Sequence, residues 1–199
     1  SRFVSSSSIV STPLSKLVGQ FVCRDWLVSR SRSHYSSNCL PVEKPGTSPK
    51  EWRIVIDLRD VNAKVLDDCY PAMTEFDVHH KLYGMKRFSS LDLRHWYWQI
   101  SLDEASKKCT GFHVPGLGSF QYEVMPMGVK SACAVGQALA EDVLRFVYDG
   151  PGPHNGKIGL STFCIVWMDD ILIYDEDAPY HAHYVAWVLK RLAHRNIQA

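Results

Sequence analysis

Two adjacent aspartates, Asp169 and Asp170, stand between two apolar runs in VWMDDILIY (166–174). Runs of β-branched and aromatic residues of this kind are typical of buried strands, so the carboxylates lie where one strand turns into the next. A carboxylate that is buried without a positive partner is costly to desolvate. The pattern therefore predicts either an exposed turn or a site that holds a cation.

A third carboxylate, Asp92, ends the apolar strand RFSSLDL (87–93). If these strands are neighbours in one sheet, Asp92 converges with Asp169 and Asp170 at one edge. Oxygen-only clusters suit hard cations such as Mg²⁺, which takes phosphates as further ligands. Two such ions about 3.5–4 Å apart activate an attacking oxygen and stabilise a leaving one in phosphoryl transfer. Aspartates are also common in turns that hold no metal, so this interpretation depends on Asp92.

The cysteines and histidines form no recognisable metal motif. Six cysteines are scattered without a CxxC pair, which favours a reducing compartment over a disulfide scaffold. The pairs His79–His80 and His181/His183 are too loosely arranged to predict zinc. The Ser-rich start lacks the apolar segment of a secretory signal, and the apolar runs reach only strand length. We therefore expect an intracellular protein, in a cytoplasmic particle or the nucleus, without a transmembrane helix.

The net charge of +1 does not by itself indicate nucleic-acid binding, but the charge is unevenly distributed. Residues 1–64 carry ten Lys/Arg against five Asp/Glu, which leaves twelve against sixteen in the remainder. A basic first part and an acidic second part suit a polyanion held by one and metal ions held by the other.

The elements that must position the acidic residues begin with a predicted hairpin. In WRIVIDLR (52–59) apolar and polar residues alternate, with Val55 as the exception. This predicts a half-buried strand that presents a polar, mainly basic row. The segment 42–52 before it contains two prolines and one glycine, which predict the hairpin tip.

Helices and strands alternate in the rest of the chain. Residues 70–85 have Pro near the start, a Thr cap and Gly84 at the end, which predicts a helix. An Ala- and Val-rich helix is expected after the Pro-Met-Gly turn at 126–128. This order of mixed strands and helices indicates an α+β sheet domain. Further expectations are loose helical periodicity at 13–28, strands at 87–93 and 118–125, an extended piece after 93, a flexible surface insertion at 150–159, a hairpin at the paired aspartates, and a helix at 182–195.

Four motifs in a fixed order carry a family resemblance. WRIVIDLRDVN, RFSSLDLRHWYWQISL, FQYEVMPMGVKSA and VWMDDILIYDED resemble the motifs of reverse transcriptases, most closely those of gypsy-type LTR retrotransposons. The resemblance extends from about Trp26 to Ala199. It implies a fingers-and-palm fold in which an antiparallel palm sheet is backed by helices. The implied parts are an N-terminal extension (1–25), fingers (26–86, with the start of the palm helix near 70–85) and a palm (87–199).

The resemblance also implies roles for single residues. Asp92, Asp169 and Asp170 match the catalytic, metal-binding triad. The backbone carbonyl of Leu93 would be a further ligand of two Mg²⁺ ions, for which Mn²⁺ would substitute. Tyr97 matches the aromatic steric gate, whose flat ring admits deoxyribose and clashes with a ribose 2′-OH.

Other matches concern the incoming nucleotide. Arg53 matches the fingers arginine that grips the triphosphate, where a planar fork suits phosphate oxygens. Lys44 is expected to be a second phosphate contact, with Lys50 as its alternative. Met127 and Gly128 match the floor of the nucleotide pocket. The residues expected near the template or primer are Asp57, Arg59, Trp167 and Met168.

Several residues depart from the family pattern. Trp167 stands where the family usually has Tyr or Phe, and Cys133 and Gly136 replace the usual Pro and Phe. Trp96 replaces a small residue before the gate, so its bulk would crowd the nucleotide site if it pointed there. Trp96 and Trp98 have two interpretations, buried packing and base stacking.

The resemblance implies an RNA-directed DNA polymerase that extends a DNA or RNA primer on an RNA template with dNTPs. One alternative is a catalytically impaired nucleic-acid-binding domain descended from such an enzyme, with its pocket blocked by Trp96. A viral RNA-dependent RNA polymerase palm fits less well, because that class generally has an acidic residue near the position of Tyr97. The thumb, the RNase H domain and the other parts of the polyprotein are expected outside this chain.

Overall fold

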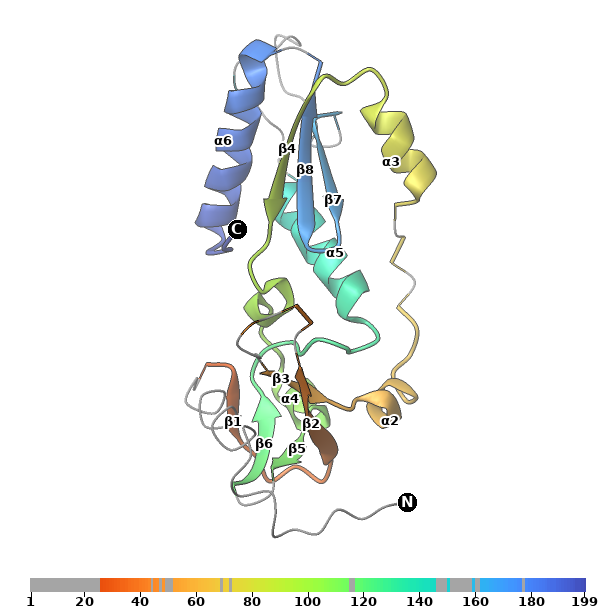
Figure 1. Ribbon diagram of the computed structural model, residues 1–199, viewed down its shortest axis with the longest axis vertical. Helices are drawn as coiled ribbons and strands as arrows, with labels where there is room; N and C mark the ends of the chain where they lie inside the picture. Colours follow the sequence, from red (N-terminus) through yellow and green to blue (C-terminus); the bar gives the residue numbers. More distant parts are fainter. Residues whose placement is uncertain are drawn as a thin grey trace. The chain divides into compact units, whose positions relative to one another are not determined.

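The chain divides into two compact units that interleave along the sequence. Unit 1 combines Ser1–Leu66 with Tyr97–Lys130, and unit 2 combines Asp67–Trp96 with Ser131–Ala199. The predicted fingers and palm are continuous stretches, whereas each unit joins two stretches because the chain returns to unit 1 at Tyr97. The structure, a computed structural model (Figure 1), describes residues 26–43, 45–46, 48, 52–68, 70–71, 73–114, 117–145, 150, 159, 162–176 and 178–199.

Unit 1 contains a five-stranded sheet in the order β1-β6-β5-β2-β3. Neighbouring strands are antiparallel except β2 and β5, which run parallel. Its apolar core includes Leu27, Phe112 and Phe120, each at most 2% exposed. The elements of unit 1 are β1 (Val28–Arg30), β2 (Ser37–Glu43), β3 (Trp52–Ile56), α2 (Arg59–Asn62), α4 (Glu104–Cys109), β5 (Phe112–Val114) and β6 (Gly118–Tyr122).

The predicted hairpin is present as β2 and β3, which pair from Cys39↔Ile56 to Glu43↔Trp52. The alternation of β3 is confirmed, since Ile56 is 7% exposed and Val55 is 38% exposed. The exception noted in the sequence is thus an apolar side chain on the outer face of the strand.

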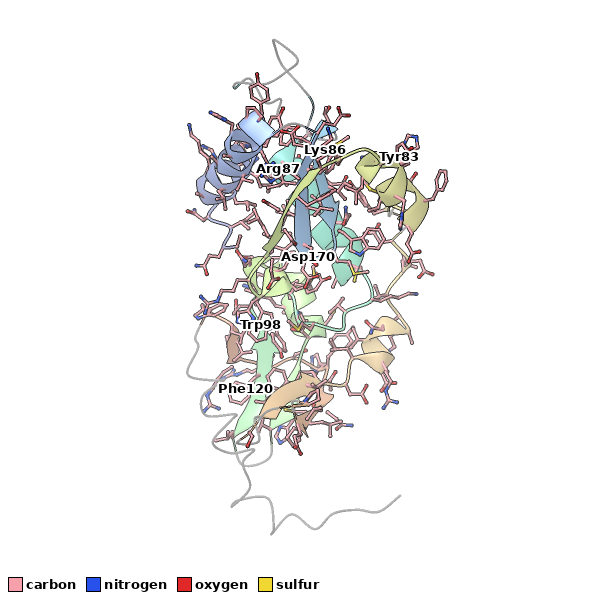
Figure 2. All side chains as sticks on the ribbon, turned by 45° about the horizontal axis from the view of Figure 1, so that its top comes forward. Tyr83, Lys86, Arg87, Trp98, Phe120 and Asp170 are labelled. Atoms are coloured by element: carbon pink, nitrogen blue, oxygen red, sulfur yellow. The ribbon has the colours of Figure 1, made fainter. Side chains whose placement is uncertain are left out.

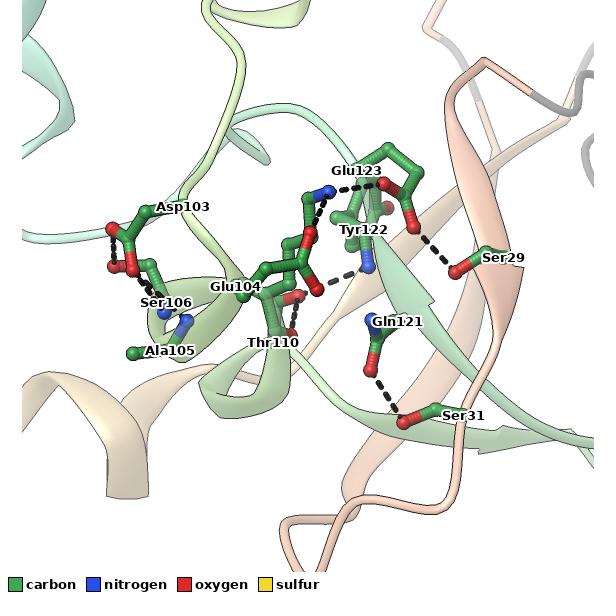
Figure 3. Close-up of polar contacts among 11 residues, drawn as sticks. Ser29, Ser31, Asp103, Glu104, Ala105, Ser106, Thr110, Gln121, Tyr122 and Glu123 are labelled. Carbon is green, nitrogen blue, oxygen red and sulfur yellow. Dashed lines mark hydrogen bonds and ion pairs between the residues drawn. The ribbon is translucent and has the colours of Figure 1, made fainter.

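A polar network ties α4 to β6 and β1 (Figure 3). Lys107 Nζ lies 2.7 Å from Glu104 Oε1 and 2.6 Å from Glu123 Oε2. Ser29 Oγ donates a hydrogen bond to Glu123. The hydrogen bonds to the two carboxylates raise the pKa of Lys107 to about 12.

Unit 2 contains a three-stranded antiparallel sheet in the order β4-β8-β7. Helix α6 contacts β4 and β8, and α5 contacts β7 and α6. Ser89 Oγ lies 2.8 Å from His181 Nε2 of α6, so the sheet face with Ser89 and its partner Ile173 is the one that α6 covers. The elements of unit 2 are α3 (Glu75–Leu82), β4 (Arg87–Asp92), α5 (Ala132–Leu144), β7 (Cys164–Trp167), β8 (Asp170–Asp175) and α6 (Ala178–His194).

The helix predicted over 70–85 begins later, at Glu75. Thr74 is its N-cap, because the Thr74 hydroxyl accepts from the Asp77 N–H and the Asp77 carboxylate accepts from the Thr74 N–H. The helix ends before Gly84, whose φ of 82° suits a residue without a side chain. The predicted cap and the predicted end are confirmed, and the predicted proline start is wrong.

Three other expectations change. The extended piece predicted after residue 93 includes a 3₁₀ helix, η1 (Trp96–Gln99). The closing helix begins at Ala178 rather than at 182, because Pro179 is tolerated in a first turn, where no N–H is needed. The strand predicted over 118–125 ends at Tyr122.

Two predicted segments fall largely outside the described residues. Of the stretch 13–28, only 26–28 are described, and Val28 begins β1. Of the insertion 150–159, only the two end residues are described. No described helix has the length and apolar character needed to cross a membrane.

Candidate active site

Unit 2 brings the three predicted carboxylates to one end of its sheet. Asp92 and Asp170 are direct partners in the antiparallel register of β4 and β8. The backbone N–H of Leu93 donates to the carbonyl of Asp169 at 2.8 Å, which holds Asp169 at the same end. All three aspartates are exposed, whereas the Leu93 side chain is 1% exposed. The site is therefore an acidic turn that faces solvent, and the side chain of the neighbouring Leu93 is buried beneath it.

The three carboxylates suit a divalent cation. Within the described part of the chain, none of them has a salt bridge with Lys, Arg or His. Like charges this close in sequence and register repel one another, and hard oxygen donors favour Mg²⁺ as the positive partner. Among the described residues no three His, Cys, Asp or Glu side chains are already arranged around one point. Binding an ion would thus draw the exposed side chains together.

The turn between β7 and β8 has a strained backbone. Trp167 pairs with Asp170, which leaves Met168 and Asp169 as a two-residue loop. Such loops favour primed turns with positive φ, and Met168 has a φ of 56°. A non-glycine residue in this conformation stores on the order of 1–3 kcal/mol and persists only where the surroundings hold it.

Gln137 of α5 is the side chain that holds this turn. Its Nε2 donates to the carbonyl of Val166 at 2.9 Å, and its Oε1 accepts from the Met168 N–H at 3.2 Å. Nε2 also donates to Glu141 Oε1 at 2.7 Å, and Glu141 in turn accepts from the Tyr70 hydroxyl at 2.6 Å. Gln137 is only 8% exposed; its hydrogen bond to Val166 is buried, and those to Met168 and Glu141 are partly buried. A buried amide thus fixes the backbone on which Asp169 and Asp170 stand.

The two tryptophans that flank Tyr97 in the sequence pack against their own units. Trp96 is 2% exposed. Trp98 is half-buried and contacts the apolar core of unit 1. These positions favour the packing interpretation over base stacking. Trp167 and Met168 are 36% and 49% exposed, so both are accessible at the turn.

Of the predicted nucleotide residues, Leu93 belongs to unit 2 and the others belong to unit 1. Met127 is 54% exposed, and Gly128 has a φ of 92°, a conformation that favours glycine. Asn62 braces this turn, since its Nδ2 donates to the Gly128 carbonyl at 2.8 Å and its Oδ1 accepts from the Lys130 N–H at 2.9 Å. Tyr97 is half-buried.

The fingers residues are described in part. The backbone of Arg53 pairs with Val42, whereas its side chain lies outside the described residues, as do Lys44 and Lys50. Their expected phosphate contacts stay predictions.

Asp57 and Arg59, expected near the template, form an ion pair with each other. Arg59 Nε donates to Asp57 Oδ1 at 2.8 Å and Nη2 donates to Oδ2 at 2.6 Å. The hydrogen bonds from Arg59 lower the pKa of Asp57 to about 2. Asp57 follows β3 and Arg59 begins α2, so the two charges largely cancel at this connection.

Sequence reasoning missed the two bracing amides. Gln137 is the one amide among the apolar and small residues that form the buried side of α5. A polar residue at a position that the helical period assigns to the buried side was the signal available in the sequence. Asn62 ends the motif WRIVIDLRDVN, but nothing local connects it with a turn 66 residues later.

Comparisons with known proteins agree with this architecture. The family described as "Reverse transcriptase (RNA-dependent DNA polymerase)" matches residues 42–199. The chain is 34% identical over 179 residues to the "Retrovirus-related Pol polyprotein from transposon gypsy" of Drosophila melanogaster. That alignment covers 88% of this chain and 16% of the polyprotein, so the chain spans a small part of this relative's length.

Solved structures share the fold. A "Prototype Foamy Virus Protease-Reverse Transcriptase CSH mutant" superposes with a TM-score of 0.72 at 21% identity, over 92% of this chain and 22% of that one. The "foamy viral protease-reverse transcriptase dRH in complex with ds DNA" gives a TM-score of 0.71 at 22% identity, over 90% and 29% of the two chains.

Proposed function

Because this chain belongs to the reverse transcriptase family and is a gypsy-type domain, we propose that it is the catalytic part of an RNA-directed DNA polymerase of an LTR retroelement. The observation that carries the proposal is the pairing of Asp92 with Asp170 beside Asp169, at the end of a sheet whose turn is braced from below. Its expected partners are an RNA template, a DNA or RNA primer and a dNTP, inside the cell.

Asp92, Asp169 and Asp170, with the carbonyl of Leu93, would hold two Mg²⁺ ions, or Mn²⁺ in their place. The chemistry that such ions supply is a lowered pKa of the primer hydroxyl and neutralisation of the triphosphate charge. The carbonyl of Leu93 accepts one hydrogen bond, from the Trp96 N–H at 3.1 Å, which leaves it a further lone pair. The contribution of the chain is a fixed backbone that carries the three carboxylates, so that only their side chains would have to move to bind the ions.

The reaction is an in-line transfer of a nucleotidyl group. The primer 3′ oxygen forms a bond to the α-phosphorus of the dNTP and loses its proton. The bond from that phosphorus to the bridging oxygen breaks, and pyrophosphate leaves with the electron pair. Most of the rate enhancement comes from positioning and electrostatic stabilisation, as in other phosphoryl transfers.

The residues matched to the family's nucleotide contacts would select and hold the dNTP. The guanidinium of Arg53 would bind the triphosphate with two parallel hydrogen bonds, assisted by Lys44 or Lys50. The Met127–Gly128 turn would form the pocket floor, and the ring of Tyr97 would exclude a 2′-OH. Asp57, Arg59, Trp167 and Met168 would lie near the template and primer.

The test is extension of a DNA primer by one nucleotide on an RNA template, with dNTP and rNTP compared. The proposal expects dNTP incorporation, its loss in Asp169→Asn, and increased rNTP use in Tyr97→Ala. Glu75→Gln removes an exposed carboxylate of the same unit and should change nothing. Tight template–primer binding without any extension would instead select the impaired binding domain. Equal use of rNTP and dNTP by the unmodified chain would select an RNA polymerase.

A further inference from the structure

A basic and aromatic surface covers the connection from α3 into β4. We call it the α3–β4 patch and define it as Phe76, His80, Tyr83, Lys86 and Arg87. Phe76 and Tyr83 are 77% and 87% exposed. The rings of Phe76 and His80 stack with their centroids 6.4 Å apart. Figure 2 shows Tyr83, Lys86 and Arg87 following one another along this connection.

The part of the patch that leads from α3 into β4 is positively charged. The eleven residues VHHKLYGMKRF (78–88) contain two Lys, one Arg, two His and no Asp or Glu. Lys86 and Arg87 are exposed, and within the described chain neither has a salt bridge. Asp175, the strand partner of Arg87, is only 8% exposed, so Glu176 is the accessible carboxylate next to it. The segment from Lys81 to Arg87 is therefore positively charged, whereas the exposed Glu75 and Asp77 flank Phe76 at the start of α3.

Exposed cations and exposed aromatic rings together fit a particular ligand. Isolated apolar residues on a surface are ordinary and need no partner. Here two aromatic side chains lie seven residues apart, two helical turns, and so share one side of α3 and its C-terminus. Aromatic rings on which bases stack, beside cations that contact the backbone, are the parts of a single-strand binding surface. A duplex would offer phosphates but no free base faces.

The patch is separate from the aspartates. Arg87 and Asp92 are the two ends of β4, five residues apart. At about 3.3–3.4 Å per residue this is roughly 17 Å, too far for one nucleotide to contact both. Figure 2 agrees, with Lys86 and Arg87 at one end of the paired strands β4 and β8 and Asp170 at the other.

We propose that the α3–β4 patch binds single-stranded nucleic acid, with Lys86 and Arg87 on phosphates and Tyr83 and Phe76 stacked on bases. The inference rests on the proposed function only in that this protein meets nucleic acid, and it requires no catalysis. The bound segment would be an unpaired stretch of the template or primer strand away from the catalytic turn.

The test measures binding of short single-stranded RNA and DNA to the full chain by fluorescence anisotropy, without dNTP or divalent metal. It compares the unmodified chain with Tyr83→Ala, Phe76→Ala and the double variant Lys86→Gln/Arg87→Gln. Controls on α6 are Leu189→Ala, which removes an exposed apolar side chain, and Lys190→Gln, which removes an exposed positive charge. Asp169→Asn is measured as well, since it should bind as the unmodified chain does even though it fails to extend a primer.

The aromatic variants should each weaken binding about tenfold, the range expected for one lost base stack. The double cation variant should weaken it similarly and reduce the slope of log K against log salt by about 1.4, or 0.7 for each phosphate. The controls should bind normally. Unchanged binding in the patch variants would overturn the proposal. The patch would then be interpreted as a surface that binds another protein. A salt effect in the cation variant without any effect in the aromatic variants would also overturn the proposal.

Discussion

Replacing Gln137 with Leu should release the turn that carries Asp169 and Asp170. The substitution nearly keeps the side-chain volume and removes the hydrogen bonds to Val166 and Met168. A net hydrogen bond is worth about 1 kcal/mol, and the partly buried backbone groups left without a partner add to this loss. We therefore expect the free energy of unfolding to fall by about 2–3 kcal/mol.

The catalytic effect should exceed what unfolding explains. Without Gln137 the Met168 N–H loses its hydrogen-bond partner, so the strained loop would relax and the backbone that carries the carboxylates would shift. The assay is urea denaturation together with single-nucleotide extension under conditions where the variant is fully folded. Extension should fall by about tenfold or more, since misplacement by 1 Å has effects of this size.

Two further variants make the test specific. Gln137→Glu keeps the acceptor for the Met168 N–H but loses the donor to Val166 and adds a charge beside Glu141, so it should be at least as damaging. Gln121→Leu loses a hydrogen bond from Ser31 at a half-buried position in unit 1 and should lose no more than about 1 kcal/mol. The reasoning would be refuted if the free energy of unfolding of Gln137→Leu lay within about 0.5 kcal/mol of that of the unmodified chain and the variant extended primers normally.

Three other predictions concern single groups. Asn62→Ala should lower the free energy of unfolding by about 1–2 kcal/mol, because it removes both hydrogen bonds to the turn after β6, as urea denaturation would measure. Carboxyl NMR should give Asp57 a pKa of about 2, and the pKa should return to its ordinary value in Arg59→Ala. The ion pair stabilises the fold above the pKa that Asp57 has in the unfolded chain, and this stabilisation is lost as the pH falls toward 2. An unchanged titration of Asp57 in the variant would contradict the pairing. Burial raises the pKa of the Cys164 thiol to about 12, so alkylation of the folded chain at pH 8 should label the exposed Cys133 and spare Cys164, with mass spectrometry as the readout.

The parts of the site that follow from local patterns were predictable. The paired aspartates lie on a hairpin turn because apolar strands flank them on both sides, and Asp92 meets them because its strand ends in the same way. Thr74 was a visible cap because capping depends on residues three apart.

The remainder depends on contacts between distant segments. Gln137 reaches Val166 across 29 residues, and Asn62 reaches Gly128 across 66, distances over which one sequence carries no periodic signal. The bulk of Trp96 was visible in the sequence, but its burial depends on the turn from β4 into η1. The division into two interleaved units has the same origin, since it arises from packing and not from composition.

The measurement that tests the central claim most directly is the rate of single dNTP incorporation on an RNA template over a Mg²⁺ titration, in the unmodified chain, Asp92→Asn, Asp170→Asn and Glu75→Gln. We predict a saturable dependence on Mg²⁺ in the unmodified chain and in Glu75→Gln. Both aspartate variants should incorporate at least about a hundredfold more slowly, in the range seen when one stabilising group is removed from an active site. Incorporation that is independent of the metal, or that survives in Asp92→Asn and Asp170→Asn, would contradict the assignment of these carboxylates.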